Sequence, residues 1–71
     1  MPARFLTLAD VEEALSISPS QAYALVRSGE LRAIKIGGRG QWRVEVTELD
    51  AFIERSYAAT DAYIKANPGT D

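Results

Sequence analysis

The apolar residues of the N-terminal third recur at helical spacing in two short stretches. In the first stretch the apolar positions that share one helical face are Leu8, Val11, Ala14 and Leu15. Thr7 precedes this stretch, and Asp10 stands three residues later in the position of a capping-box partner. The pattern predicts a first helix over about residues 8–15.

The second stretch carries stronger start and stop signals. Ser18 and Gln21 have the spacing of a capping box, and Pro19 occupies the first helical position. Gly29 offers the left-handed conformation that commonly closes a helix. These signals predict a second helix over about residues 19–28. Two short helices joined by a tight turn make a helix-turn-helix.

A period of two follows the second helix and predicts a strand over residues 31–36, with Ile34 and Ile36 on one face and Ala33 and Lys35 on the other. Residues 37–41 are rich in glycine and permit the chain to reverse.

The return strand is predicted over residues 42–44, with Trp42 and Val44 pointing inward and Trp42 serving as a packing anchor of the core. This antiparallel pair is expected to project Arg39 from its tip. Arg43 and Lys35 are expected to lie cross-strand on one outer face, where they would neutralise phosphates.

A third helix is predicted to begin at Thr47, with Asp50 three residues later. Its helically spaced apolar positions are Leu49, Phe52, Ile53, Tyr57, Tyr63 and Ile64. The helix either continues to about residue 66 or breaks near residues 59–61, where Thr60 would cap a short fourth helix. Its distal apolar residues either fold back onto the core or form a dimer seam, and the need for buried area in a short chain favours the first use.

Composition narrows the function classes. The 71 residues are 46% apolar and 25% charged, as in one small globular domain, and no apolar run approaches the ~18 residues of a membrane span. The chain has no cysteine and no histidine, which excludes disulfides, thiolate zinc sites and Ser-His or Cys-His catalytic pairs. We therefore expect a binding module without enzymatic activity, metal or cofactor. The first six residues lack the long apolar stretch of a secretory signal, so a cytoplasmic protein is expected.

The charge distribution points to an anionic partner. Residues 27–43 hold five basic residues and one acidic residue, whereas both flanking segments are net acidic. A phosphate-binding loop is a poor interpretation of the glycine-rich turn, because the turn joins two strands and no Lys-Ser or Lys-Thr follows it. A small-molecule substrate and a membrane are not expected as partners.

In sequence, the chain resembles the excisionase-type, MerR-like winged-helix DNA-binding domain over about residues 5–56. The segments that carry the resemblance are FLTLADV at 5–11, SPS at 18–20, VRSGEL at 26–31, IGGR at 36–39, WR at 42–43 and EL at 48–49. It implies a mostly α fold with a small β-hairpin, that is, a winged helix-turn-helix. The winged helix-turn-helix domain would span residues 1–56, and a helical extension with a short tail would follow over residues 57–71.

The family consists of small bacterial and phage DNA-binding proteins that act as transcription regulators or recombination directionality factors. By resemblance, the second helix docks in the major groove of double-stranded DNA and the wing touches an adjacent groove. The residues expected at this interface are Ser18, Ser20, Gln21, Tyr23, Ala24, Arg27, Lys35, Arg39, Gln41 and Arg43.

Two features depart from the family pattern: Gly40 and Gln41 lengthen the hairpin, and Ala24 stands where relatives often carry a basic residue. Useful affinity would need a homodimer, tandem sites or cooperative assembly on DNA. The alternative function is a protein-interaction adaptor that uses the winged fold and the C-terminal helix.

Overall fold

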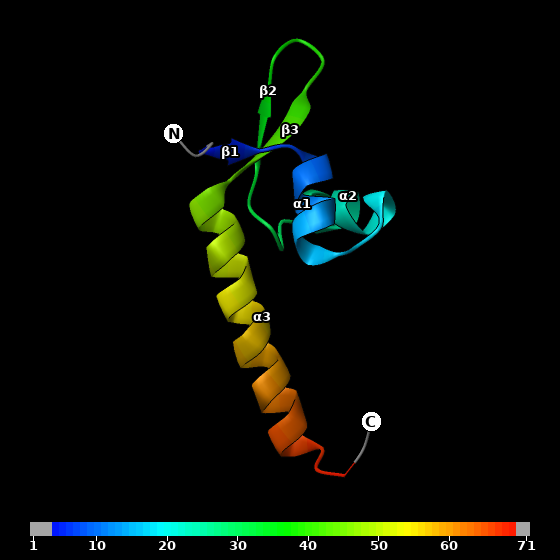
Figure 1. Cartoon of the computed structure of the whole chain (residues 1–71), viewed down its shortest axis with the longest axis vertical. Coiled ribbons are helices and arrows are strands. Elements are labelled where there is room, and N and C mark those ends of the chain that lie inside the picture. Colours follow the sequence, from blue (N-terminus) through cyan, green and yellow to red (C-terminus); the bar gives the residue numbers. More distant parts are fainter. Residues whose placement is uncertain (1–3, 70–71) are drawn as a thin grey trace.

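Three helices and three short strands make up residues 4–69, the part of the chain that the computed structural model describes (Figure 1). The elements run in the order β1 (Phe5–Leu6), α1 (Leu8–Leu15), α2 (Pro19–Ser28), β2 (Ile34–Ile36), β3 (Gln41–Glu45) and α3 (Val46–Ala66). The predicted winged helix-turn-helix is confirmed. Of the predicted domain 1–56 and extension 57–71, residues 1–3 and 70–71 lie outside the described part.

Local hydrogen bonds fix the ends of α1 and α2 where the sequence predicts them. The Asp10 backbone N–H donates to Thr7 Oγ1 at 3.1 Å, and the Thr7 N–H donates to Asp10 Oδ2 at 3.0 Å. Ser18 and Gln21 form the same reciprocal box at α2, with Pro19 in the first turn. Gly29 then ends α2 in the left-handed region at φ 84°. Both predicted helix ranges are confirmed.

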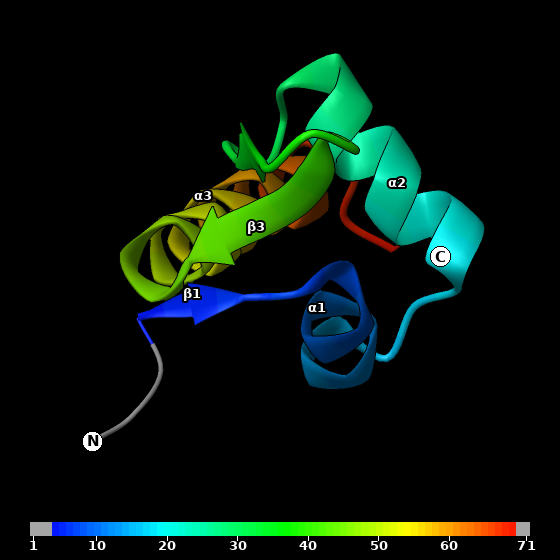
Figure 2. The same ribbon diagram turned by 90° about the horizontal axis from the view of Figure 1, so that it is seen from above.

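The sheet has the strand order β1-β3-β2, and both pairings are antiparallel. Figure 2 shows β1 and β3 running in opposite directions. The strand β1 was not predicted from the sequence, since two residues are too short to show a period of two. The predicted strand 31–36 is wrong at its start. Leu31 donates its backbone N–H to the carbonyl of Leu25 and buries its side chain completely, so it completes the end of α2 instead of joining the ladder.

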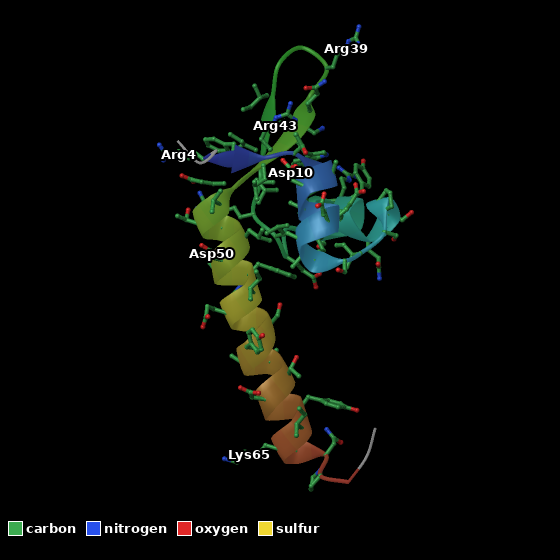
Figure 3. The ribbon with its side chains drawn as sticks, in the orientation of Figure 1. Arg4, Asp10, Arg39, Arg43, Asp50 and Lys65 are labelled. Atoms are coloured by element: carbon green, nitrogen blue, oxygen red, sulfur yellow. The ribbon has the colours of Figure 1, made fainter. Side chains whose placement is uncertain are left out.

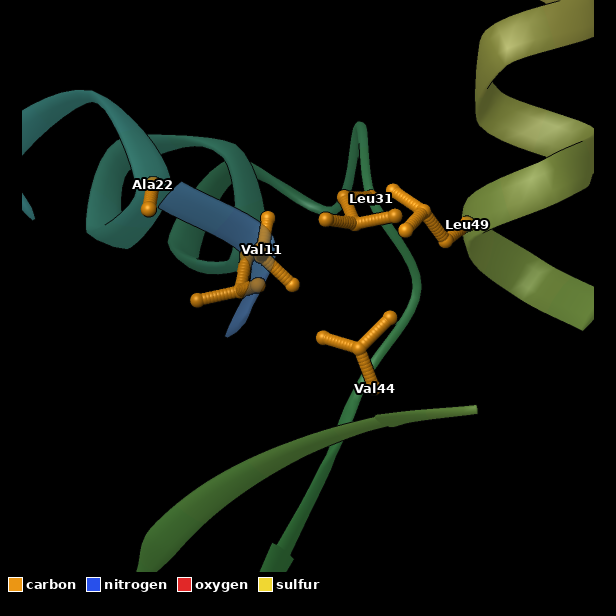
Figure 4. Close-up of a cluster of buried hydrophobic side chains, with 6 residues drawn as sticks. Val11, Ala22, Leu31, Val44 and Leu49 are labelled. Atoms are coloured by element: carbon orange, nitrogen blue, oxygen red, sulfur yellow. The ribbon is translucent and has the colours of Figure 1, made fainter. Parts of the chain in front are cut away.

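A buried cluster joins all three helices to the sheet (Figure 4). Its buried members are Val11, Ala22, Val26, Leu31, Val44 and Leu49. Trp42, the predicted packing anchor, is half-buried and packs against the margin of this cluster. The cluster holds α2 by its inner side and thereby determines which residues α2 presents to solvent.

The helix α3 differs from its prediction at its start and in its direction, whereas its length agrees with one of the two predicted forms. It begins at Val46 directly after β3, with Glu45 as an N-cap that makes no side-chain bond, so Thr47 is not the start. It continues to Ala66 without a break, which confirms the longer predicted helix, and residues 4–69 contain no fourth helix capped by Thr60. It also leaves the domain instead of folding back, because a straight helix of this length extends past the small core, and the molecule is 49 Å long (Figure 1).

No helix within residues 4–69 is long and apolar enough to cross a membrane.

Candidate nucleic-acid interface

The helix α2 has one buried face and one exposed face. Ala22 and Val26 are buried and Leu25 is half-buried against the core, as the helical spacing predicts. The residues predicted to read DNA are all exposed on the remaining surface, at Ser20, Gln21, Tyr23, Ala24 and Arg27. Ser20 and Ala24 are small, so this face can approach another surface closely.

The cap of α2 restricts what Gln21 can offer a ligand. Gln21 Oε1 accepts hydrogen bonds from the backbone N–H of Ser18 at 3.0 Å and from its hydroxyl at 3.3 Å. Ser18 Oγ in turn accepts from the backbone N–H of Gln21 at 3.2 Å. While the cap is closed, the amide oxygen of Gln21 is occupied and its NH₂ group provides donors only.

The turn of the hairpin determines which side chains share a face. Gly37 and Gly40 both have positive φ, at 85° and 62°, and the Gly40 N–H donates to the Gly37 carbonyl at 3.1 Å. This closes a four-residue turn in which Ile36 pairs with Gln41. Arg39 lies in the turn and extends from the tip of the hairpin, as predicted (Figure 3).

The register corrects the prediction for Lys35 and Arg43. Lys35 pairs with Trp42, and Arg43 pairs with Ile34. Side chains of directly paired residues lie on the same face of a sheet, and successive residues alternate. Lys35 and Arg43 therefore point to opposite faces, and their predicted cross-strand position on one face is wrong.

The face of the hairpin that carries Lys35 is the one turned toward the helices, because Val44 on that face is buried in the core that Val11 of α1 and Leu49 of α3 also enter. We call it the helical face. The Lys35 ammonium lies 5.1 Å from the centroid of the Trp42 ring, within the range of a cation–π interaction. The Lys35 side chain also crosses Gly40, where an added Cβ would meet Lys35 Cδ at 3.3 Å.

The opposite face, which we call the outer face, holds Gln41 and Arg43. The Arg43 guanidinium donates to Gln41 Oε1 at 3.0 Å and to the Trp42 carbonyl at 2.8 Å. The side chain of Arg43 is half-buried, whereas Ile34 beside it is 46% exposed. A shallow pocket of about 150 Å³ on this face is lined by Phe5, Arg32, Ala33, Ile34, Arg43, Glu45 and Glu48.

The five basic residues of segment 27–43 thus divide between two surfaces. Arg27 on α2, Lys35 on the helical face and Arg39 at the tip are exposed. Arg32 lies 3.6 Å from Glu48 and lines the outer-face pocket with Arg43. Clustering of five basic residues in the sequence favours a single basic surface, and the structure contradicts this for Arg32 and Arg43.

A protein family described as a helix-turn-helix domain matches residues 5–57. The chain belongs to this family. The match confirms the resemblance drawn from the sequence motifs, and it covers every element from β1 to the middle of α3. No curated protein and no solved structure matches the chain. Membership in a helix-turn-helix family indicates binding to double-stranded DNA, and such domains are typically not enzymes.

The division of the wing of this helix-turn-helix domain into two faces was the feature that sequence reasoning missed. A signal existed: Trp42 was predicted inward, and any residue paired with Trp42 must also face inward. The length of the glycine-rich turn determines which residue pairs with Trp42.

Among the described residues, no group of three or more acidic side chains is placed to hold a metal ion.

Proposed function

We propose that this protein binds double-stranded DNA with sequence specificity, inserting α2 into the major groove. The single observation that carries the proposal is that the core holds one side of α2 in place and leaves the opposite side exposed. Small residues at Ser20 and Ala24 leave room for the groove walls, and an α-helix fits the width of a B-DNA major groove. The winged helix-turn-helix fold supports the same docking.

The wing supplies positioning contacts. Lys35 lies on the face turned toward the helices, and Arg39 lies at the tip. We assign Lys35 to a phosphate and Arg39 to the adjacent groove or its phosphates. Gln41 and Arg43 lie on the outer face and bond to each other, so we place both outside the DNA contact.

Base reading is assigned to α2. With its oxygen held by Ser18, Gln21 acts as a donor and suits the acceptor-rich edge of guanine or the O4 atom of thymine. Bidentate pairing with adenine needs a free amide oxygen and is therefore disfavoured. Ala24 fits against a thymine methyl, and Arg27 reaches a guanine or a phosphate.

We assign the DNA-bound protein a role as a transcription regulator or an excisionase-like recombination factor of the bacterial cytoplasm, acting by occupying or bending its site. The resemblance to the excisionase-type family supports both roles. One small domain makes few contacts, so its affinity for a single site is expected to be modest and strongly dependent on salt.

The experiment is a selection from random duplex oligonucleotides followed by fluorescence anisotropy on the enriched site. Ala24→Glu places a negative charge on the reading face and is expected to lower affinity at least 100-fold without unfolding the exposed helix. Ala58→Glu is the matched control at an exposed position of α3 and is expected to leave affinity nearly unchanged. A selection without enrichment, or an equal loss in both variants, would contradict the proposal.

A further inference from the structure

The outer face of the sheet presents apolar side chains to solvent. Three paired positions place their side chains on this face: Phe5 with Glu45, Ile34 with Arg43, and Ile36 with Gln41. The three apolar members, Phe5, Ile34 and Ile36, are 37%, 46% and 49% exposed. Because a strand rises about 3.3 Å per residue, successive pairs on one face lie roughly 6.6 Å apart. The outer face is therefore an open apolar surface with a regular spacing.

The outer-face pocket occupies one end of this surface. It is lined by the pairs that contain Phe5 and Ile34, by residues 32–33 before β2 and by Glu48 in the first turn of α3. Its volume of about 150 Å³ is smaller than the roughly 300–1,000 Å³ of sites that enclose a small-molecule ligand. The pocket has room for one apolar side chain. Its size therefore favours a segment of a protein over a free metabolite.

The charges around the pocket are paired except for that of Arg43. Glu45 Oε2 lies 2.7 Å from Arg4 Nε, and Glu48 Oε2 lies 3.6 Å from the guanidinium of Arg32. Within residues 4–69, Arg43 makes no such ion pair. The two carboxylates of the lining are thus neutralised, and one positive charge is left for a bound partner to complement.

Arg43 is held in a position that suits a carboxylate. Its bonds to the Trp42 carbonyl and to Gln41 Oε1 use two of its five N–H groups, so three remain for a ligand. The side chain is half-buried beside Ile34, and the lower local dielectric strengthens its attraction for an anion. A planar guanidinium with free N–H groups pairs with a carboxylate through two parallel hydrogen bonds.

We infer that the outer face binds an extended segment of a partner protein in which an acidic residue has an apolar residue two positions away on each side. One apolar side chain fills the outer-face pocket, the carboxylate bonds to Arg43, and the second apolar side chain packs on Ile36. Residues two apart in an extended chain share one side and lie roughly 6.6 Å apart, which matches the spacing of the pairs on the sheet. The pattern is symmetric, so it fits in either chain direction.

The position of this surface makes the partner compatible with DNA. Resting on the proposed function, DNA lies against α2 and the helical face of the wing, so the outer face stays free in the DNA complex. A contact with one pocket and one ion pair is small and belongs to the transient class of interfaces. The protein would then hold a second protein weakly at its DNA site.

A titration of the full-length, ¹⁵N-labelled chain with a short peptide tests the inference without DNA. The probe is the pentapeptide Leu-Ser-Asp-Ser-Leu, acetylated and amidated to remove its terminal charges. The matched controls are Leu-Ser-Asn-Ser-Leu, which lacks the charge, and Ala-Ser-Asp-Ser-Ala, which lacks the large apolar groups. The first peptide is expected to shift the amide signals of Ile34, Ile36 and Arg43 and to bind at least 5-fold more tightly than either control. Equal affinity for all three peptides, or shifts centred on α2, would overturn the inference.

Two protein variants show whether Arg43 recognises the carboxylate. Arg43→Gln is expected to bind the Asp and Asn peptides within 2-fold of each other, because the group that distinguishes them is gone. Lys35→Gln removes the same charge from the opposite face of the hairpin and is expected to keep the 5-fold preference. An equal loss of preference in both variants would indicate a general charge effect and overturn the assignment to Arg43. The comparison of peptides on the wild-type chain decides the inference even if Arg43→Gln does not fold.

Two further titrations distinguish other occupants of the outer face. Dilution of the wild-type chain alone is expected to leave the signals of Ile34 and Arg43 unchanged. Shifts with protein concentration would assign the face to a second copy and overturn the inference. A selected duplex is expected to leave the peptide affinity unchanged within 2-fold, and displacement of the peptide by DNA would assign the outer face to DNA instead. The peptide titration itself contains no DNA, so its result stands if the proposed function fails.

Discussion

Lys35 and Arg43 are both basic residues of the hairpin, but we propose different roles for them because their surroundings differ. Lys35 lies over Trp42 on the helical face, whereas Arg43 bonds to Gln41 on the outer face. We expect Lys35→Ala to reduce the slope of log affinity against log salt concentration by about 0.9, the value for one lost phosphate contact. Arg43→Ala is expected to leave the slope unchanged. Anisotropy titrations at four salt concentrations measure both slopes, and a larger change for Arg43→Ala would contradict the assignment.

Gly40 leaves space for the side chain of Lys35. Gly37→Ala and Gly40→Ala both place a side chain at positive φ, so both are expected to destabilise the domain by about 1–2 kcal/mol. Only Gly40→Ala also meets the Lys35 side chain, since nothing lies within 4 Å of a Cβ at Gly37. Urea unfolding should show similar losses of stability, and only Gly40→Ala should lower the salt slope. Equal slopes would show that the position of Lys35 is unimportant.

The element α3 divides into a part that supports the fold and a part that does not. Leu49 is 6% exposed and belongs to the core, whereas Ile64 is 59% exposed. Leu49→Ala is expected to cost about 2–5 kcal/mol of unfolding free energy. Ile64→Ala is expected to change it by less than about 0.5 kcal/mol. Urea denaturation followed by Trp42 fluorescence at low protein concentration measures both, and comparable losses would contradict this division.

The sequence predicted elements that depend on neighbouring residues and missed features that depend on distant ones. Capping boxes at Thr7 and Ser18 act over three residues, so α1 and α2 were located correctly. The strand β1 exists only because Leu6 pairs with Val44, far along the chain. The direction of α3 depends on how little of its apolar face the small core can cover, and spacing alone does not indicate that.

The candidate site shows the same division. The exposed face of α2 could be predicted from helical periodicity, because burial of Ala22 and Val26 leaves the opposite side of the helix exposed. The faces of the wing residues could not be predicted in this way, because a shift of one residue in hairpin register moves every side chain to the other face. Three glycines among residues 37–40 are compatible with more than one turn length, and only the pairing of Ile36 with Gln41 places Lys35 and Arg43 apart.

In the whole molecule, we expect the helix-turn-helix domain and the C-terminal extension to be separable. Residues 54–69 are exposed throughout, and the core ends before them. A chain cut after Arg55 keeps that residue's bond to the Glu30 carbonyl and is expected to retain the fold and the affinity for a single DNA site. Circular dichroism measures the fold and anisotropy measures the affinity, and a large loss of single-site affinity in a folded fragment would contradict the separation.

The central claim is that duplex DNA lies against α2 and the helical face of the wing. Amide chemical-shift mapping on a selected duplex tests this most directly. The account predicts the largest shifts in α2, Lys35 and Arg39, with small shifts at the outer-face residues Ile34 and Arg43 and along the distal half of α3. Shifts centred on the outer face or on α3, with α2 unaffected, would contradict it.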